Sequence, residues 1–122
     1  MRETRKILEM PDLQISVFTV RVPVFISHSE AVWVRLRQRV DRQTLIQSLK
    51  AQHGLEVVDQ PEKALYPLAT TATGNDPVYV GRVHRDLDDE NTWLLWVVSD
   101  NLRKGAALNG LQIAARIFDI PC

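Results

Sequence analysis

The stretch VYVGRVHRDLDDENTWLLWVV, residues 78–98, decides the fold. Residues 78–84 and 92–98 are rich in β-branched and aromatic side chains, which favour β-strands. Residues 86–91 between them are mostly acidic or polar, as is typical of a tight connection between neighbouring strands. Strands that follow each other across such a connection tend to pair antiparallel. The stretch therefore predicts two antiparallel strands joined by an acidic turn.

Three segments upstream of this stretch are also predicted to be strands. Residues 15–20 and 55–58 are short runs dominated by β-branched and other apolar side chains. Residues 31–37 alternate instead, which places on one face Val32, Val34 and Leu36, and on the other face Trp33, Arg35 and Arg37. The second face of that strand meets either water or a partner.

Two early segments carry helix signals. Residues 3–10 are typical of a helix that Pro11 ends, because proline cannot continue the backbone hydrogen-bond ladder. Asp41 is a good N-cap for a helix over residues 42–53, and Gly54 can close that helix in a left-handed conformation.

A last helix is predicted over residues 102–118, where apolar side chains recur and residues 105–107, Gly-Ala-Ala, allow another backbone to approach closely. Residues 59–76 show little periodicity and contain two prolines and a glycine, which predicts a long loop. Together the elements predict an α+β fold with a mostly antiparallel sheet and helices packed on one face.

Length and composition predict one domain that spans residues 1–122. A chain of this size would bury about two-thirds of its unfolded surface around one core. The second faces of the strands are expected to carry Trp33, Tyr79 and Trp93, which are costly to leave in water. We therefore expect the sheet to self-associate.

The charge balance excludes several classes of partner. Lys plus Arg and Asp plus Glu both number 15, so no long-range field favours nucleic acid or an anionic membrane. No apolar run reaches the roughly 18 residues that a bilayer span requires, and the first residues lack the apolar core of a signal peptide. A cytoplasmic location is therefore expected.

The cysteine and histidine content argues against two kinds of chemistry. The single cysteine, Cys122, cannot form an internal disulfide. A nucleophilic thiolate needs a lowered pKa and a shaped pocket, which a chain end rarely supplies, so Cys122 is not expected to be a nucleophile. The spacing of His28, His53 and His84 matches no metal-binding pattern, so metal chemistry is not expected.

His28 and Arg21 are the candidate site residues. An imidazole titrates near neutral pH and suits proton transfer, although a lone histidine in an apolar segment can equally be a structural hydrogen-bonding residue. Arg21 lies in the strongly apolar run 17–25, where a guanidinium requires an anion. That anion is either a ligand carboxylate or a structural Asp or Glu, or the side chain reaches solvent from a strand edge.

Geometry restricts how these two residues can act together. They are seven positions apart, which would span roughly 23 Å if fully extended, and the odd spacing would place the side chains on opposite faces. A turn that uses Pro23 and Ser27 would allow Arg21 and His28 to face one open concavity.

Two blocks resemble a known family. Residues 21–32, RVPVFISHSEAV, resemble the catalytic-histidine segment of the aspartate-semialdehyde dehydrogenases. Residues 99–114, SDNLRKGAALNGLQIA, are similar to the closing helix of that family, in the same order. The resemblance extends from Glu3 to Ala115 and implies a domain like the carboxy-terminal domain of glyceraldehyde-3-phosphate dehydrogenase.

The resemblance also implies an activity and residue roles. Members convert 4-phospho-L-aspartate to L-aspartate 4-semialdehyde through a cysteine thioester, with hydride from NADPH and release of phosphate, in lysine (diaminopimelate), threonine and methionine biosynthesis. It implies that His28 is the acid/base catalyst, that Arg21 binds the substrate α-carboxylate and that Asn101 contacts the nicotinamide cofactor. It further implies a homodimer or a dimer of dimers.

Several features of the family are missing from this chain. It lacks the nucleophilic cysteine with its following glutamine, the phosphate-binding arginine, the glycine-rich cofactor loop and the Glu-x-x-Lys pair that precedes the Glu3-Thr4-Arg5-Lys6 run. We therefore expect a carboxy-terminal part of a larger enzyme, which needs an amino-terminal NADP-binding domain and is inactive alone. The alternative is a stand-alone dimerisation module or relic without catalysis.

Overall fold

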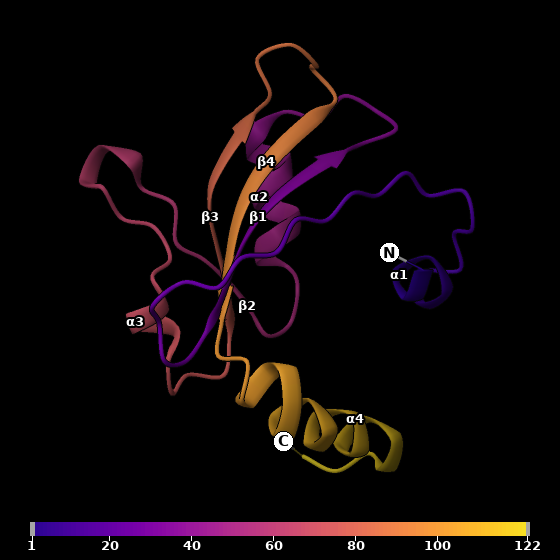
Figure 1. Ribbon diagram of the computed structural model, residues 1–122, viewed down its shortest axis with the longest axis vertical. Helices are drawn as coiled ribbons and strands as arrows, with labels where there is room; N and C mark the ends of the chain where they lie inside the picture. The colour runs from indigo at the N-terminus through magenta and orange to yellow at the C-terminus, as the bar shows by residue number, and fades with distance from the viewer. Residues whose placement is uncertain (1, 122) are drawn as a thin grey trace.

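The computed structural model describes residues 2–121, and the chain in this range forms one four-stranded sheet with helices around it (Figure 1). The elements are, in chain order, α1 (Arg2–Ile7), β1 (His28–Arg35), α2 (Arg42–Lys50), β2 (Leu55–Val57), a 3₁₀ turn (Pro61–Lys63), α3 (Ala69–Ala72), β3 (Val78–Arg85), β4 (Thr92–Ser99), a π-helical turn (Arg103–Ala107) and α4 (Leu108–Phe118). The expected α+β class is confirmed.

The strands lie in the order β1-β4-β3-β2. β4 pairs antiparallel with both β1 and β3, and the predicted hairpin of residues 78–98 forms the centre of the sheet. β2 pairs parallel with β3, because the long connection over residues 58–77 returns the chain to the same end of the sheet. The sheet is therefore mostly antiparallel, as expected.

The core lies between the sheet and α2. Val80, Val83 and Trp93 are its buried centre, and the apolar side chains of α2 pack against them. α2 begins where Asp41 accepts a hydrogen bond of 2.7 Å from the backbone N–H of Thr44. Asp41 is thus the N-cap that the sequence predicted, because its carboxylate satisfies a backbone donor that the helix leaves free.

Trp93 lies on the core face of the sheet, so its predicted place on the second face is wrong. In the register of β1 and β4, Trp93 stands opposite Val34, and directly opposed residues share a face. Trp33 stands opposite Leu94 on the second face and is 60% exposed, whereas Trp93 is 2% exposed. The predicted alternation of residues 31–37 agrees with the burial of β1.

The connection over residues 58–77 covers part of the second face. Trp96 donates a hydrogen bond of 3.0 Å from its indole Nε1 to the carbonyl of Pro67, and Ala72 of α3 is fully buried. Gly81 makes this close approach possible, since a Cβ there would lie 2.5 Å from Cδ of Pro67 and would also collide with the carbonyl oxygen of Val58. The predicted loop thus contains two short helical turns and packs on the sheet.

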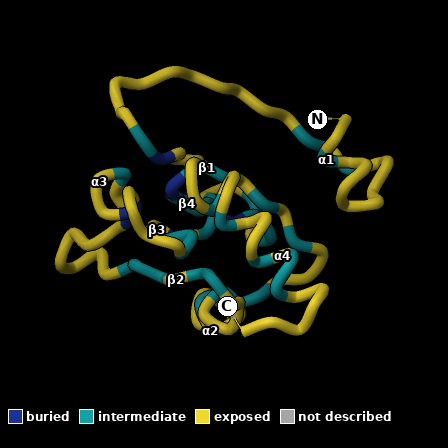
Figure 2. Tube along the Cα trace, turned by 90° about the horizontal axis from the view of Figure 1, so that it is seen from below, coloured by how far each residue is buried: buried dark blue, intermediate teal, exposed yellow. Residues whose placement is uncertain are grey.

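The stretch before β1 has no strand partner. Residues 15–20, predicted as a strand, belong to no ladder within residues 2–121. Figure 2 shows α2 on one side of the sheet and this stretch looping out on the opposite side, exposed over most of its length. The strand prediction is wrong for this chain because a β-branched run needs a neighbouring strand to pair with.

The last predicted helix is interrupted at its start. Residues 103–107 form a π-helical turn in which Ala106 has a non-helical backbone, and the regular helix begins at Leu108. α4 projects from the end of the sheet and has no buried residue (Figure 1). Within residues 2–121, the helices are too short or too polar to cross a membrane.

Candidate functional site

His28 is the first residue of β1 and stands opposite Ser99 at the end of β4. Its side chain is exposed. The preceding residue, Ser27, is only 6% exposed and has a φ of 86°, in the left-handed region that few non-glycine residues adopt. The chain therefore enters β1 through a sharp, buried change of direction immediately before His28.

Asn101 holds that change of direction in place. Its Oδ1 accepts a hydrogen bond of 2.9 Å from the backbone N–H of Ser27, although the two residues are 74 positions apart in sequence. Since Ser27 is bonded covalently to His28, the structure brings two of the three predicted site residues into one neighbourhood. Both lie at the end of the sheet where β1 begins and β4 ends.

Ser27 also connects this end of the sheet to α3. Its Oγ donates to the carbonyl of Ala69 at 3.2 Å and lies 3.0 Å from Oγ1 of Thr73. Thr73 in turn donates to the carbonyl of Ala69 at 2.8 Å. The Ser27 hydroxyl thus links the start of β1 to the short helix α3.

Asp100 completes the arrangement. Asp100 is 3% exposed, and its carboxylate accepts hydrogen bonds from the backbone N–H groups of Gly74, Leu102 and Arg103, at 2.8, 2.8 and 3.2 Å. The N–H of Gly74, followed by those of Leu102 and Arg103, lowers the pKa of Asp100 from its ordinary value, against the opposing effect of burial. We call Ser27, Thr73, Asp100 and Asn101 the polar cluster.

Sequence reasoning missed the structural role of the polar cluster. One signal was present in the sequence, an Asp-Asn pair directly after a strand. The side chain of an Asp or Asn in such a place often accepts hydrogen bonds from the backbone N–H groups two or three positions ahead. The partners of Asn101 and Ser27 lie far away in sequence, so local patterns could not identify them.

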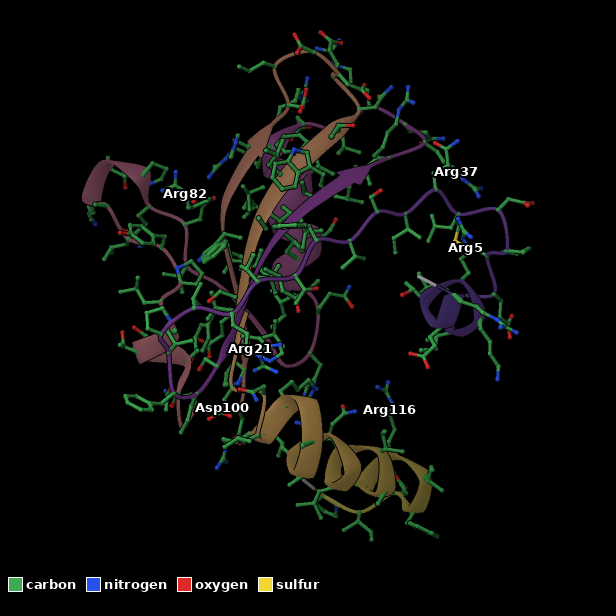
Figure 3. All side chains as sticks on the ribbon, viewed as in Figure 1. Arg5, Arg21, Arg37, Arg82, Asp100 and Arg116 are labelled. Atoms are coloured by element: carbon green, nitrogen blue, oxygen red, sulfur yellow. The ribbon has the colours of Figure 1, made fainter. Side chains whose placement is uncertain are left out.

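Arg21 lies on the exposed stretch that leads towards Ser27 (Figure 3). The backbone does turn between Arg21 and His28, because the N–H of Val24 donates to the carbonyl of Val22 at 2.8 Å around Pro23. Within the described residues, the Arg21 side chain makes no ion pair or hydrogen bond. That Arg21 and His28 share one concavity stays a prediction.

A cavity of about 430 Å³ opens beside the site, between the second face of the sheet and the start of α3. Ser29, Pro67 and Trp96 line it. His28 does not, because successive residues of a strand point to opposite faces. Within residues 2–121, His, Cys, Asp and Glu side chains form no group that could hold a metal ion.

Comparison with known proteins gives consistent matches. The family model described as "Semialdehyde dehydrogenase, dimerisation domain" matches residues 1–104. An aspartate-semialdehyde dehydrogenase of Bacillus subtilis is 44% identical over 115 residues, which are 93% of this chain and 33% of that protein. One from Aquifex aeolicus is 40% identical over 92% of this chain and 33% of its own length. The chain thus spans about a third of the length of these relatives.

Solved structures match in the same way. The crystal structure of aspartate semialdehyde dehydrogenase II from Vibrio cholerae superposes with a TM-score of 0.88 at 40% identity, over 96% of this chain and 34% of that one. The same enzyme complexed with ASA gives a TM-score of 0.85 at 42% identity, over 92% and 33% of the two chains.

Proposed function

Since the chain belongs to the semialdehyde dehydrogenase dimerisation-domain family, we propose that it is the carboxy-terminal catalytic and dimerisation part of an aspartate-semialdehyde dehydrogenase. In this proposal residues 1–122 form one domain of a cytoplasmic enzyme whose other part supplies the nucleophilic cysteine and most of the NADP site. The complete enzyme reduces 4-phospho-L-aspartate to L-aspartate 4-semialdehyde with release of phosphate, in lysine, threonine and methionine biosynthesis.

The observation that carries the proposal is the hydrogen bond between Asn101 and the backbone of Ser27. It joins the two sequence blocks that resemble the family, at the point where an exposed imidazole follows a buried, fixed residue. A proton-transfer group must be held within hydrogen-bond reach of the reacting atoms, and a fixed backbone before His28 provides this.

His28 is assigned the transfer of protons to and from the substrate. Its imidazole is exposed at a strand end, where a substrate held by the other part of the enzyme can reach it. Arg21 is assigned the α-carboxylate, because a guanidinium can donate two parallel hydrogen bonds to a carboxylate. The stretch that carries Arg21 is exposed, so a substrate held by the other part of the enzyme can reach the guanidinium.

Asn101 is assigned to the nicotinamide end of the cofactor, which when bound supplies the hydride. Oδ1 of Asn101 is occupied by Ser27, and within residues 2–121 its Nδ2 amide donates no hydrogen bond. An amide donor next to the backbone of His28 fits the carboxamide oxygen of a nicotinamide. Asn101 would therefore both orient His28 and bind the cofactor.

The test replaces the corresponding third of the Bacillus subtilis enzyme with this chain. We expect the chimaera to turn over and the isolated chain to show no NADPH-dependent reduction of the acyl phosphate, because the thioester needs the missing cysteine. His28→Ala should lower kcat of the chimaera by roughly a hundredfold or more. His53→Ala removes an exposed imidazole from the turn that follows α2 and should leave kcat unchanged.

Arg21→Lys should chiefly raise KM for the acyl phosphate. An ammonium group keeps the positive charge but cannot donate two parallel hydrogen bonds to a carboxylate. A chimaera that folds and dimerises but has no activity, or one in which His28→Ala is fully active, contradicts the catalytic proposal. The first result would favour the alternative, a non-catalytic dimerisation module or relic of the same fold.

A further inference from the structure

The end of α3 contacts the residue that directly precedes His28. Oγ1 of Thr73 lies 3.0 Å from Oγ of Ser27, although the two residues are 46 positions apart in sequence. In Figure 1 the stretch that leads into β1 passes beside α3, so the two segments meet without any strand pairing between them. A side chain outside the two blocks that resemble the family, residues 21–32 and 99–114, thus reaches the start of β1.

The two hydroxyl protons can be followed through this contact. Thr73 donates its proton to the carbonyl of Ala69 at 2.8 Å, which leaves its oxygen free to accept one. The Ser27 hydroxyl has a single proton, and its two acceptors are Oγ1 of Thr73 at 3.0 Å and the carbonyl of Ala69 at 3.2 Å. Thr73 therefore supplies the shorter of the two contacts that hold the Ser27 hydroxyl.

The sheet fixes α3 without any help from Ser27. Ala72 is fully buried, and the backbone N–H of Gly74 donates to Oδ2 of Asp100 at 2.8 Å. The connection that carries α3 is also bound to β4, because Nε1 of Trp96 donates to the carbonyl of Pro67 at 3.0 Å. The position of α3, and of Thr73 at its end, is therefore set by the sheet and not by the exposed stretch before β1.

Ser27 needs such a support because of its backbone conformation. Its φ of 86° lies in the left-handed region, and a non-glycine residue stays there only where the surrounding contacts hold it. For Ser27 these contacts are the N–H bond of 2.9 Å to Asn101 and the hydroxyl contacts with α3. Without the hydroxyl contacts the backbone can return to a common conformation, which would change the direction in which His28 leaves it.

From these observations we propose that Thr73 is a positioning residue for His28 and acts through the hydroxyl of Ser27. The inference rests on the catalytic role proposed above for His28. Thr73 holds the proton-transfer group from behind and does not touch the substrate. Its loss should therefore lower kcat and leave KM for the acyl phosphate, which is assigned to Arg21, unchanged.

The first test measures kcat of the chimaera with the Bacillus subtilis enzyme. Thr73→Val removes the hydroxyl and keeps the shape of the side chain, so Ser27 retains only its contact with Ala69. We expect kcat to fall roughly threefold to tenfold, because a small misplacement of a catalytic group is costly. Thr73→Ser keeps the hydroxyl and should restore kcat. Thr70→Val, which removes an exposed hydroxyl of α3 outside the polar cluster, should leave kcat unchanged.

A double-mutant cycle tests the route through Ser27. In a Ser27→Ala chimaera, Thr73→Val should lower kcat no further, because the hydroxyl through which Thr73 acts is gone. The same substitution should cost nothing further in a His28→Ala chimaera. Additive losses in either background would overturn the proposal. So would a Thr73→Val chimaera with the kcat of its parent, or a loss that Thr73→Ser does not restore.

A measurement on the isolated chain separates this inference from the catalytic proposal. Hydrogen exchange of the Ser27 amide, followed by NMR, reports whether its bond to Asn101 is kept. We expect Thr73→Val to accelerate this exchange roughly tenfold or more, and Thr70→Val to leave it unchanged. Unaccelerated exchange in Thr73→Val would overturn the inference. Accelerated exchange together with a fully active His28→Ala chimaera would instead contradict the catalytic proposal and support Thr73 as the residue that holds Ser27.

Discussion

At the scale of single residues, two small residues, Gly81 and Ser27, determine how the connection over residues 58–77 lies on the sheet. Gly81 lets Pro67 and the backbone of Val58 approach to distances that no Cβ would allow. Ser27 ties α3 to the start of β1 from the other side. Both residues matter because of the segments that they allow to approach or that they bind. Their residue type alone therefore does not reveal their structural role.

Gly81→Ala should destabilise the chain by about 1–3 kcal/mol, because the added methyl group must displace backbone and a proline ring. Chemical unfolding followed by tryptophan fluorescence measures this. The control is Gly110→Ala in α4, where a Cβ meets nothing within 4 Å and helix propensity improves. A Gly81→Ala chain as stable as its parent would mean that the connection does not pack here.

Asp100 should contribute to the acid sensitivity of the fold. Its pKa is lowered in the folded chain, chiefly by the N–H of Gly74, so its stabilising effect is complete above its ordinary pKa of 3.8. That effect is lost as pH falls through the folded-state pKa, because the unfolded chain takes up the proton first. Asp100→Asn should flatten the decline of the unfolding free energy below about pH 4.

Urea unfolding at a series of acidic pH values tests this. Asp12→Asn, which removes an exposed carboxylate from the stretch before β1, is the matched control and should keep the slope of the parent. An unchanged slope in Asp100→Asn would contradict the assignment of the backbone donors to Asp100.

At the scale of elements, the sheet and its two flanking segments differ in how they are held. β3 and β4 have neighbours on both edges, and α2 covers one face. The stretch before β1 carries exposed apolar side chains, including Phe18 at 91% exposure, and α4 has no buried residue. In the isolated chain these segments are therefore held mainly by their own local backbone hydrogen bonds. Such bonds stabilise a short segment only weakly.

Hydrogen exchange should separate the two groups. We expect the amides of residues 14–23 to exchange near the rate of an unfolded peptide, and those of β4 to be the most protected, because only the latter are paired on both sides. In the chimaera with the Bacillus subtilis enzyme, residues 15–20 should become protected if their strand-forming sequence finds its partner there. Strong protection of residues 15–20 in the isolated chain would show a pairing within the chain.

At the scale of the whole molecule, apolar side chains remain on the surface in numbers that favour association. Trp33 and its register partner Leu94 lie on the second face of the sheet, and the connection that covers Trp96 leaves Trp33 60% exposed. Large exposed apolar surfaces mark contact sites. We propose a two-fold dimer built on this face, consistent with the dimerisation-domain family.

Trp33→Glu should weaken self-association by roughly tenfold or more, because it places a charge where the proposed dimer would bury an aromatic ring. Analytical ultracentrifugation at micromolar concentration measures the dissociation constant. Leu87→Glu is the control, since Leu87 is fully exposed in the turn between β3 and β4. Equal effects of both variants would show that the contact between protomers lies elsewhere. A monomeric parent chain would contradict the proposed dimer.

The sequence by itself determined the features that depend on neighbours along the chain. The alternation of residues 31–37, the hairpin of residues 78–98 and the cap at Asp41 all arise from residues that lie close together in the sequence, and all are present. The two blocks of residues 21–32 and 99–114 indicated the family for the same reason, because each is a continuous pattern.

Only the tertiary structure decided the features that depend on residues far apart. The side of the sheet on which Trp93 lies follows from the register of β4, and the bond between Ser27 and Asn101 spans 74 positions. The run 15–20 has the composition of a strand and still forms none, because pairing needs a second strand that no local pattern supplies. Propensity and periodicity act over a few residues, whereas register and burial are set by the packing of the whole chain.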